Sequence, residues 1–182
     1  MQFFLTHSLV AMKLPARFLG RSGLTLLAPQ RRRQNLLDKS GAGRLQFSLN
    51  STMESVGEVE ATADKLAIDA GLDEEERFRL TMAVREAAVN AVLHGNDYDP
   101  KKLVTASFEN TGKSLVITIA DQGEGLDPQS IPDPLAPENL MRGTGRGIFL
   151  IRSFMDEVHF RQLHPGTELT LVKHLASSKE KA

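Results

Sequence analysis

The spacing of apolar residues changes repeatedly along this chain, and the order of those changes limits the folds that it can form. Alternation of apolar and polar side chains, the period of a half-buried strand, predicts strands at residues 44–50, 103–109, 114–121, 157–162 and 168–174. Apolar residues at helical spacing predict helices at residues 52–70, 73–94 and 145–154. Because the strands pair mainly as hairpins, we expect an α/β fold: a two-layer sandwich with a mixed, mostly antiparallel sheet and helices on one face.

Capping and stop residues mark the ends of the predicted helices. Ser51 and Thr52 are both favoured helix caps, and Gly71 is a favoured helix stop. Asp73 and Glu76 form a variant of the capping box, which places the start of the second helix there. Residues 95–96, a Gly-Asn pair, end that helix.

The first 43 residues differ in character from the rest of the chain. They contain a single acidic residue, Asp38, against seven basic residues in this stretch: Lys13, Arg17, Arg21, Arg31, Arg32, Arg33 and Lys39. The apolar run at residues 3–12 is too short to span a bilayer. We expect residues 1–43 to be a basic extension without regular structure, while a transit peptide and a segment lying on a membrane surface stay open. The folded domain is predicted at residues 44–175, followed by a frayed tail at residues 176–182.

Composition excludes several classes of protein. The formal net charge of -1 offers no general attraction for nucleic acid, and no cluster of aromatic and basic residues suited to stacking bases occurs. The chain contains no cysteine, so it forms neither disulfides nor thiolate metal sites. No apolar run is long enough for a membrane-spanning helix. We therefore expect a cytoplasmic protein with no direct nucleic-acid partner and no membrane partner.

The second predicted helix carries the first candidate functional residues, Glu86 and Asn90. At helical periodicity they lie one turn apart on the same side of the helix. Mg²⁺ prefers oxygen ligands and usually keeps waters and substrate phosphates, so one Asn oxygen suits an incomplete protein shell. A carboxylate nearby could orient a hydroxyl or a water for attack. An exposed polar helix face with an internal hydrogen bond explains the same pattern and stays open.

Asp121, Gly123 and Gly125 follow a strongly apolar predicted strand. Glycines directly after a strand let a ligand approach the backbone, and a carboxylate there can accept a hydrogen bond from an exocyclic amine. A tight turn explains this pattern equally well when the pattern stands alone. A calcium loop is excluded because further oxygen ligands do not follow at EF-hand spacing.

A glycine-rich loop opens the third predicted helix. Its residues are Arg142, Gly143, Thr144, Gly145, Arg146 and Gly147. Backbone N–H groups at a helix start form an anion site, and the two arginines could add positive charge. The loop lacks the Gly-Lys-Ser/Thr of a Walker A motif, and it follows a proline-rich linker rather than a strand. Thr167 precedes the last predicted strand, where it is either a ligand for a base or a simple β-branched strand residue.

Taken together and in this order, these motifs resemble the N box, the Asp-x-Gly-x-Gly box, the second glycine box and the terminal Gly-Thr of the GHKL ATPases. Residues 86–95 and 145–158 resemble most closely the anti-sigma-factor serine kinases of that superfamily. The resemblance covers residues 45–175 and implies the Bergerat ATP-binding sandwich.

The resemblance also implies ATP and Mg²⁺ as cofactors and a role for each candidate residue. Glu86 is expected to be the catalytic base, Asn90 the magnesium ligand, and Asp121 the acceptor for the adenine amino group. Two glycines, Gly123 and Gly125, would shape the base pocket, which Thr167 would support. The phosphates are expected along Arg142, Gly143, Thr144, Gly145, Arg146 and Gly147, under a lid at residues 129–142.

The function implied by the resemblance is a serine/threonine protein kinase. It would phosphorylate a STAS-type anti-anti-sigma partner and sequester a sigma factor, and relatives suggest a homodimer. Two alternatives stay open. One is a non-catalytic binding module in which ATP only sets the affinity for a regulatory partner. The other is the ATP-binding fragment of a sensor histidine kinase, although no His-centred helical hairpin precedes residue 45.

Overall fold

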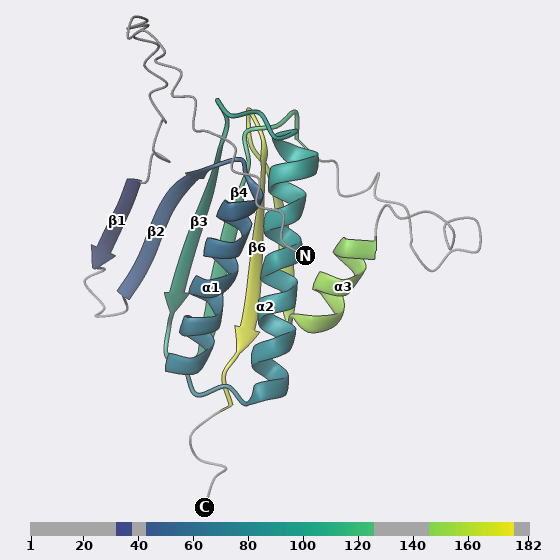
Figure 1. The fold of residues 1–182 in the computed structure, drawn as a ribbon. Coiled ribbons are helices and arrows are strands. Elements are labelled where there is room, and N and C mark those ends of the chain that lie inside the picture. The colour runs from purple at the N-terminus through teal and green to yellow at the C-terminus, as the bar shows by residue number, and fades with distance from the viewer. Residues whose placement is uncertain (1–31, 38–42, 126–145, 177–182) are drawn as a thin grey trace, which may run out of the picture.

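The computed structural model describes residues 32–37, 43–125 and 146–176, in which helices cover one side of a sheet (Figure 1). The strands are β1 (Arg32–Leu37), β2 (Gly43–Asn50), β3 (Leu103–Asn110), β4 (Ser114–Ala120), β5 (Glu157–Gln162) and β6 (Thr167–His174). They form one six-stranded sheet in the order β1-β2-β3-β4-β6-β5, and every pairing is antiparallel. Within the described residues, the mixed, mostly antiparallel sheet that the sequence predicts is therefore antiparallel throughout.

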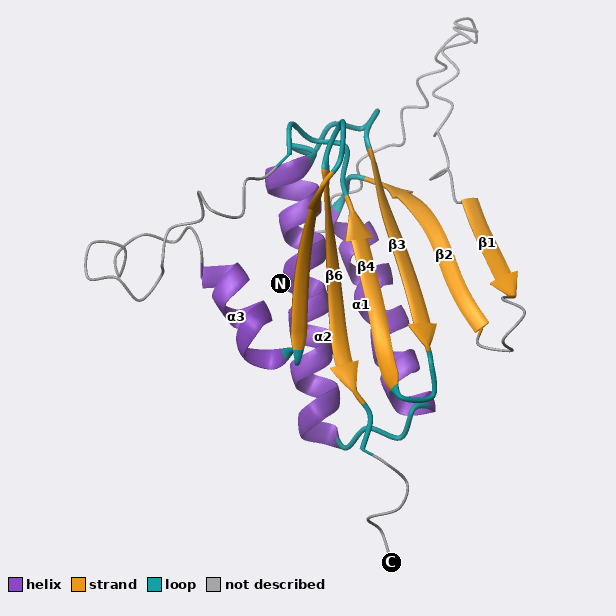
Figure 2. Ribbon diagram, turned by 180° about the vertical axis from the view of Figure 1, so that it is seen from behind, coloured by secondary structure: helices purple, strands orange, loops and turns teal. Residues whose placement is uncertain are grey.

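The described helices lie on one face of this sheet, as the sequence predicts (Figure 2). They are α1 (Met53–Asp69), α2 (Glu74–Val89) and α3 (Arg146–Phe154). A π-helical turn, η1 (Asn90–Gly95), continues α2 where an α-helical end was expected. Contacts join α2 to α1 on one side and to α3 on the other (Figure 1). No helix in the described part of the chain is both long and apolar enough to cross a membrane.

The core lies between the helices and the sheet. Phe47 of β2 and Phe108 of β3 are almost completely buried, and their rings stack with centroids 5.6 Å apart. α2 presents small buried side chains such as Ala83 and Ala87 to the same core, which lets the helix approach the sheet closely. Fully burying a large apolar side chain stabilises a fold by about 1.5–3 kcal/mol. The apolar side chains between the helices and the sheet therefore contribute most of the free energy that favours folding.

Polar contacts define the helix ends and connect α1 to α2. Thr52 caps α1 and Asp73 caps α2, and each side chain accepts a hydrogen bond from a backbone N–H of the first turn. The guanidinium of Arg85 on α2 pairs with the carboxylate of Glu60 on α1 at 2.6 Å. Both side chains are partly exposed, so this pair contributes at most about 1 kcal/mol. The two helices are held together mainly by their buried apolar faces.

β1 lies inside the segment for which the sequence predicted no regular structure, so that prediction is wrong for residues 32–37. β1 pairs antiparallel with β2, from Arg32 opposite Ser48 to Leu37 opposite Gly43. The physical reason is the edge of β2, whose unpaired N–H and C=O groups are a template for another strand. The sheet therefore begins before the expected boundary at residue 44. The rest of the predicted extension, residues 1–31 and 38–42, and tail residues 177–182 lie outside the described residues.

We predict that β1 stabilises the sheet by pairing with the edge of β2. A chain that begins at residue 32 should melt a few degrees higher than a chain that begins at residue 43. This difference in Tm is expected because a stabilisation of about 1 kcal/mol raises Tm by roughly 2–8 °C in a domain of this length. The shorter chain also exposes β2 as an edge strand and should self-associate more. Circular-dichroism melts and sedimentation velocity measure the two effects, and identical behaviour of the two chains would contradict a stabilising role for β1.

Candidate functional site

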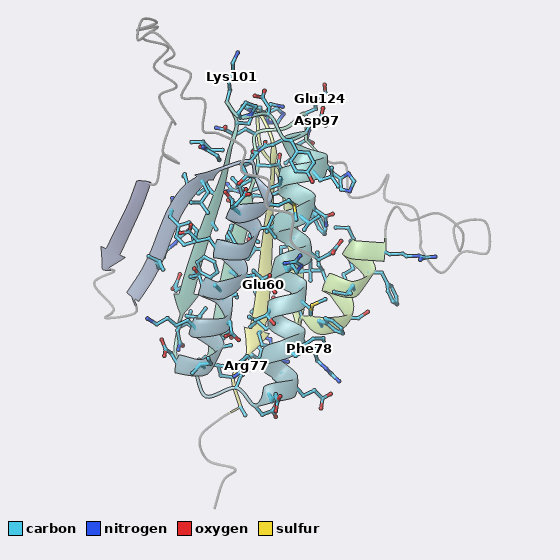
Figure 3. The ribbon with its side chains drawn as sticks, in the orientation of Figure 1. Glu60, Arg77, Phe78, Asp97, Lys101 and Glu124 are labelled. Atoms are coloured by element: carbon cyan, nitrogen blue, oxygen red, sulfur yellow. The ribbon has the colours of Figure 1, made fainter. Side chains whose placement is uncertain are left out.

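Several candidate residues lie where three loops meet at one end of the sheet. Asp121 follows β4 directly, Thr167 is the first residue of β6, and η1 ends at Gly95. Figure 3 shows Asp97, from the loop after η1, and Glu124, from the loop after β4, at this same end. Because β4 and β6 are antiparallel neighbours, the last residues of one strand lie beside the first residues of the other.

Asp121 is buried at this meeting point, with 9% of its surface exposed. Its Oδ1 accepts hydrogen bonds from the backbone N–H of Gly123 at 2.8 Å and of Thr167 at 3.2 Å. Burial raises the pKa of the Asp121 carboxyl, while these two bonds and the charge of Lys102 act in the opposite direction. Within residues 32–37, 43–125 and 146–176, no donor reaches Oδ2, so this oxygen is available to a ligand.

Glycines let the loops approach Asp121 closely. A Cβ added to Gly95 would lie 2.6 Å from Oδ2 of Asp121, and one added to Gly123 would lie 2.7 Å from the carbonyl carbon of Gly95. Both distances are far inside van der Waals contact, so only glycine fits at these two positions. Gly125 has a φ of +99°, which side chains rarely adopt. The Asp-x-Gly-x-Gly segment therefore packs closely around a buried carboxylate.

Glu86 and Asn90 lie in a second part of the site, where α2 passes into η1. Both residues are half-buried and stand one turn apart, as the sequence predicts. Gly147, in the first turn of α3, packs against Glu86: a Cβ added there would lie 2.8 Å from the carboxyl carbon of Glu86. The structure thus brings together residues from the first and third sequence motifs. π-helical turns are rare and often occur at functional sites, which agrees with the position of Asn90 at the start of η1.

Asn90 carries a polar atom that has no partner. Its Nδ2 is buried and makes no hydrogen bond within the described residues. Buried polar groups in native proteins are normally hydrogen-bonded, so an orphan of this kind indicates that a bound group supplies the partner. The amide therefore has donor capacity that no described residue uses.

The residues present fit a Mg²⁺–nucleotide complex better than a metal ion held by protein alone. In the part of the chain that the structure describes, no group of three or more His, Cys, Asp or Glu side chains could hold a metal ion. Mg²⁺ is often bound through one or two protein oxygens and completes its shell with phosphates and waters. The carboxamide of Asn90 can supply one such oxygen, and a phosphate oxygen would satisfy its unpartnered nitrogen.

Part of the predicted phosphate loop falls outside the described residues. This applies to Arg142, Gly143, Thr144 and Gly145 and to the predicted lid at residues 129–142. Arg146 is exposed at the start of α3, and Gly147 follows it against Glu86. The role of this loop in holding phosphates stays a prediction.

Sequence reasoning missed three residues that connect the parts of the site. The sequence marks Asn96 only as the end of a helix, yet its side chain is completely buried and bonds to Ser51 and to the backbone of Gln122. Ser51 lies in the turn between β2 and α1, and Gln122 lies between Asp121 and Gly123. A polar residue next to an obligate glycine is a weak signal, and only the fold reveals its partners.

Comparison with known proteins identifies the family of this chain. The model of a family described as histidine kinase-like ATPase domain matches residues 49–173. The chain is 35% identical over 140 residues to the anti-sigma F factor of Anoxybacillus flavithermus, which covers 74% of this chain and 93% of that protein. It is 29% identical over 144 residues to the serine-protein kinase RsbW of Bacillus subtilis, which covers 75% of this chain and 89% of that protein.

A solved structure shares the fold. The chain matches the crystal structure of the RsbU and RsbW domains of a Mycobacterium tuberculosis protein with a TM-score of 0.50 and 20% identity. The match covers 74% of this chain and 33% of that longer chain. Every candidate site residue, from Glu86 to Thr167, lies within the span that the family model matches. The chain belongs to the histidine kinase-like ATPase domain family.

Proposed function

We propose that this chain is an ATP-dependent anti-sigma factor and serine/threonine kinase that phosphorylates a STAS-type anti-anti-sigma protein and sequesters a sigma factor. Relatives described as anti-sigma F factor and serine-protein kinase RsbW support the proposal, since this chain covers 93% and 89% of their lengths. The observation that carries it is the position of Glu86 one turn before Asn90 and against Gly147. A cytoplasmic location and a homodimer are part of the same proposal.

Asp121 is proposed to recognise adenine. Two backbone N–H groups already occupy Oδ1, and they fix the orientation of the carboxylate. With Oδ1 held, the position of Oδ2 is also fixed, and Oδ2 would accept a hydrogen bond from the exocyclic amine of adenine. Thr167 is proposed to support the same base, because its backbone N–H donates to Oδ1 and holds the residue beside the carboxylate. Such a bond to an ionised acceptor is worth about 1.5–3 kcal/mol.

Asn90 is proposed to hold the metal end of the nucleotide through its carboxamide oxygen. A bound Mg²⁺ would neutralise charge on the phosphates and orient them for transfer. The glycine-rich loop that ends at Gly147 would approach the phosphates from α3. The buried, unpartnered Nδ2 of Asn90 supports this assignment, because the protein provides the group and leaves its partner to the ligand.

Glu86 is proposed to be the general base. Its carboxylate would accept the proton of the partner's Ser or Thr hydroxyl as that oxygen attacks the terminal phosphorus of ATP, while ADP leaves. Among the described residues this carboxylate has no hydrogen-bond or ion-pair partner, and it lies against Gly147, which supports the role. Gly147 limits the positions that the side chain can occupy, which keeps the carboxylate beside the start of α3.

Asp121→Asn should weaken adenine binding by about ten- to hundredfold, which corresponds to the loss of one charge-assisted hydrogen bond. The variant keeps an oxygen for the bonds from Gly123 and Thr167 but replaces the free acceptor with an amide. Calorimetry with adenosine and with Mg-ADP measures the effect. Unchanged affinity for both ligands would remove Asp121 from the adenine site.

Asp121 should make both the stability of the fold and the affinity for adenosine depend on pH. Because burial raises the pKa of Asp121, the folded protein without nucleotide holds this proton more tightly than the unfolded chain does. The stability that this proton contributes is therefore largest below the unfolded pKa and is lost as pH rises through the folded pKa. Adenosine affinity should increase over the same rise in pH. Both trends should be absent in Asp121→Asn, and their persistence in that variant would assign them to another group.

Variants of Glu86 and Asn90 should separate chemistry from binding. Asn90→Ala removes the metal ligand, so Mg-ATP binding and phosphoryl transfer should both fall. Glu86→Gln should bind Mg-ATP almost normally while transfer falls about 10²- to 10⁴-fold, the usual scale for a general base. Glu75→Gln, the same substitution on an exposed part of α2, is the matched control and should transfer normally.

The assay is transfer of labelled γ-phosphate to the STAS partner recovered from the native host by a pull-down. Nucleotide binding is measured in parallel. A wild type that transfers nothing to any recovered partner, while ATP still changes partner affinity, would exclude the kinase and leave a nucleotide-dependent binding module. Recovery of a component of a sensor histidine kinase, in place of a sigma factor or a STAS protein, would favour a histidine-kinase fragment.

Gly147→Ala should slow phosphoryl transfer by displacing the carboxylate of Glu86, against which the new Cβ would press. The double variant with Glu86→Gln should be no slower than Glu86→Gln alone, because both changes act through the same group. Steady-state kcat values for the single and double variants test this. Additive losses would show that Gly147 acts independently of Glu86.

A further inference from the structure

Asn96 is the most completely buried polar residue near the site, with 0% of its surface exposed. Its Nδ2 donates to Ser51 Oγ at 2.7 Å and to the carbonyl of Leu103 at 3.1 Å. Its Oδ1 accepts from the backbone N–H of Gln122 at 2.8 Å. An Asn amide has two N–H donors, so the donor capacity of this side chain is fully used. The proposed function assigns no role to this residue.

The bonds of Asn96 connect the two ends of the proposed nucleotide site. Its backbone N–H donates to Ala91 at 2.9 Å and so closes the last turn of η1, whose first residue is Asn90. Its side chain holds Gln122, which lies between Asp121 and Gly123. A single residue is therefore bonded both to the turn that presents the metal ligand and to the loop that presents the adenine acceptor.

Packing reinforces this connection. Gly95, the residue before Asn96, touches the Asp121 carboxylate so closely that an added Cβ would lie 2.8 Å from Cβ of Asp121. The backbone of Gly95 also lies against Gly123. Interiors packed at this density transmit displacements rather than absorb them. Movement of η1 would therefore displace the loop after β4.

The backbone that follows Asn96 is in a strained conformation. Asp97 and Tyr98 have φ values of +53° and +54°, in the left-handed region that favours glycine. The N–H of Tyr98 returns to the carbonyl of Val92 at 3.0 Å, back on η1. Conformations of this kind persist only where the surrounding structure holds them, and they concentrate at functional sites. The side-chain bonds of Asn96 hold this segment from one end, together with the bond from Tyr98 to Val92.

We propose that Asn96 is a positioning residue that locks the metal-binding turn, η1, to the adenine-binding loop, residues 121–123. The proposal rests on the proposed function, because it concerns the two ends of a bound nucleotide. Because η1 and residues 121–123 are held at a fixed separation, a ligand that contacts both does not have to pay the entropy of ordering either segment. A ligand that contacts only one of the two segments gains no affinity from their fixed separation.

The ratio of two affinities isolates this effect. Asp121 keeps its own bonds to Gly123 and Thr167 when Asn96 is removed, so adenosine binding should change little. A Mg-nucleotide must span both ends and should lose affinity. In Asn96→Ala, the ratio of the affinity for Mg-ADP to the affinity for adenosine should therefore fall roughly tenfold. This is the scale of one lost hydrogen bond.

Ser51→Ala is the matched control. It removes one bond of the same Asn96 amide but leaves the bond to Gln122 intact. A purely structural role for Asn96 predicts that both variants lower stability and leave the affinity ratio unchanged. The positioning role predicts that both lower stability while only Asn96→Ala lowers the ratio. An unchanged ratio in Asn96→Ala, or an equal fall in Ser51→Ala, would overturn the proposal.

Amide hydrogen exchange on the wild type provides a second test if Asn96→Ala does not fold. In the nucleotide-free chain, the amides of Asn96, Tyr98 and Gln122 should have protection factors within about threefold of one another, because they open as one unit. Exchange at Gln122 about a hundredfold faster than at Asn96 would show that the loop moves independently of η1 and would overturn the lock.

These outcomes are distinct from failure of the proposed function. A wild type that binds both ligands but transfers no phosphate would exclude the kinase, and the affinity ratio would still decide the role of Asn96. A wild type that binds neither ligand would overturn the nucleotide site and the positioning role together.

Discussion

The carboxylate of Asp121 is the group around which one end of this molecule is arranged. It is buried, and the backbone N–H groups of Gly123 and Thr167 hold one of its oxygens. Burial of a carboxylate is costly unless hydrogen bonds compensate, and here the compensation is incomplete because the second oxygen has no donor among the described residues. The two bonds fix the orientation of the carboxyl group and leave its second oxygen without a donor among the described residues. A side chain at Gly95 would meet this carboxylate, and a side chain at Gly123 would meet the backbone of Gly95.

A second group of residues depends on the helix that leads to this end. α2 fixes Glu86, and its π-helical continuation presents Asn90 one turn later. Gly147 brings the start of α3 against the same carboxylate. The helix determines the spacing of Glu86 and Asn90, and the sheet determines the place of Asp121. Asn96 and Gly95 join the two systems, which explains why an apparently simple helix end contains a fully buried amide.

Local patterns in the sequence were sufficient for most of the fold. Alternation at residues 103–109 and 114–121 corresponds to β3 and β4, and the Asp73 cap starts α2. The candidate motifs were also identifiable, because a helical turn spaces Glu86 and Asn90 whatever surrounds them. Local reasoning failed where distant partners decide the structure. Residues 32–37, four polar residues followed by two leucines, lack alternation, and their strand conformation comes from the edge of β2. Asn96 finds its partners 45, 7 and 26 residues away, so no window of sequence reveals its role.

The most direct test of this account is a crystal structure of the chain with Mg²⁺ and a non-hydrolysable ATP analogue. The account predicts that the adenine amino group lies within hydrogen-bond distance of Oδ2 of Asp121. It also predicts that the carboxamide oxygen of Asn90 binds the metal and that the terminal phosphate faces Glu86. A nucleotide bound elsewhere, or bound here with adenine away from Asp121 and the metal away from Asn90, would contradict the site and the function derived from it.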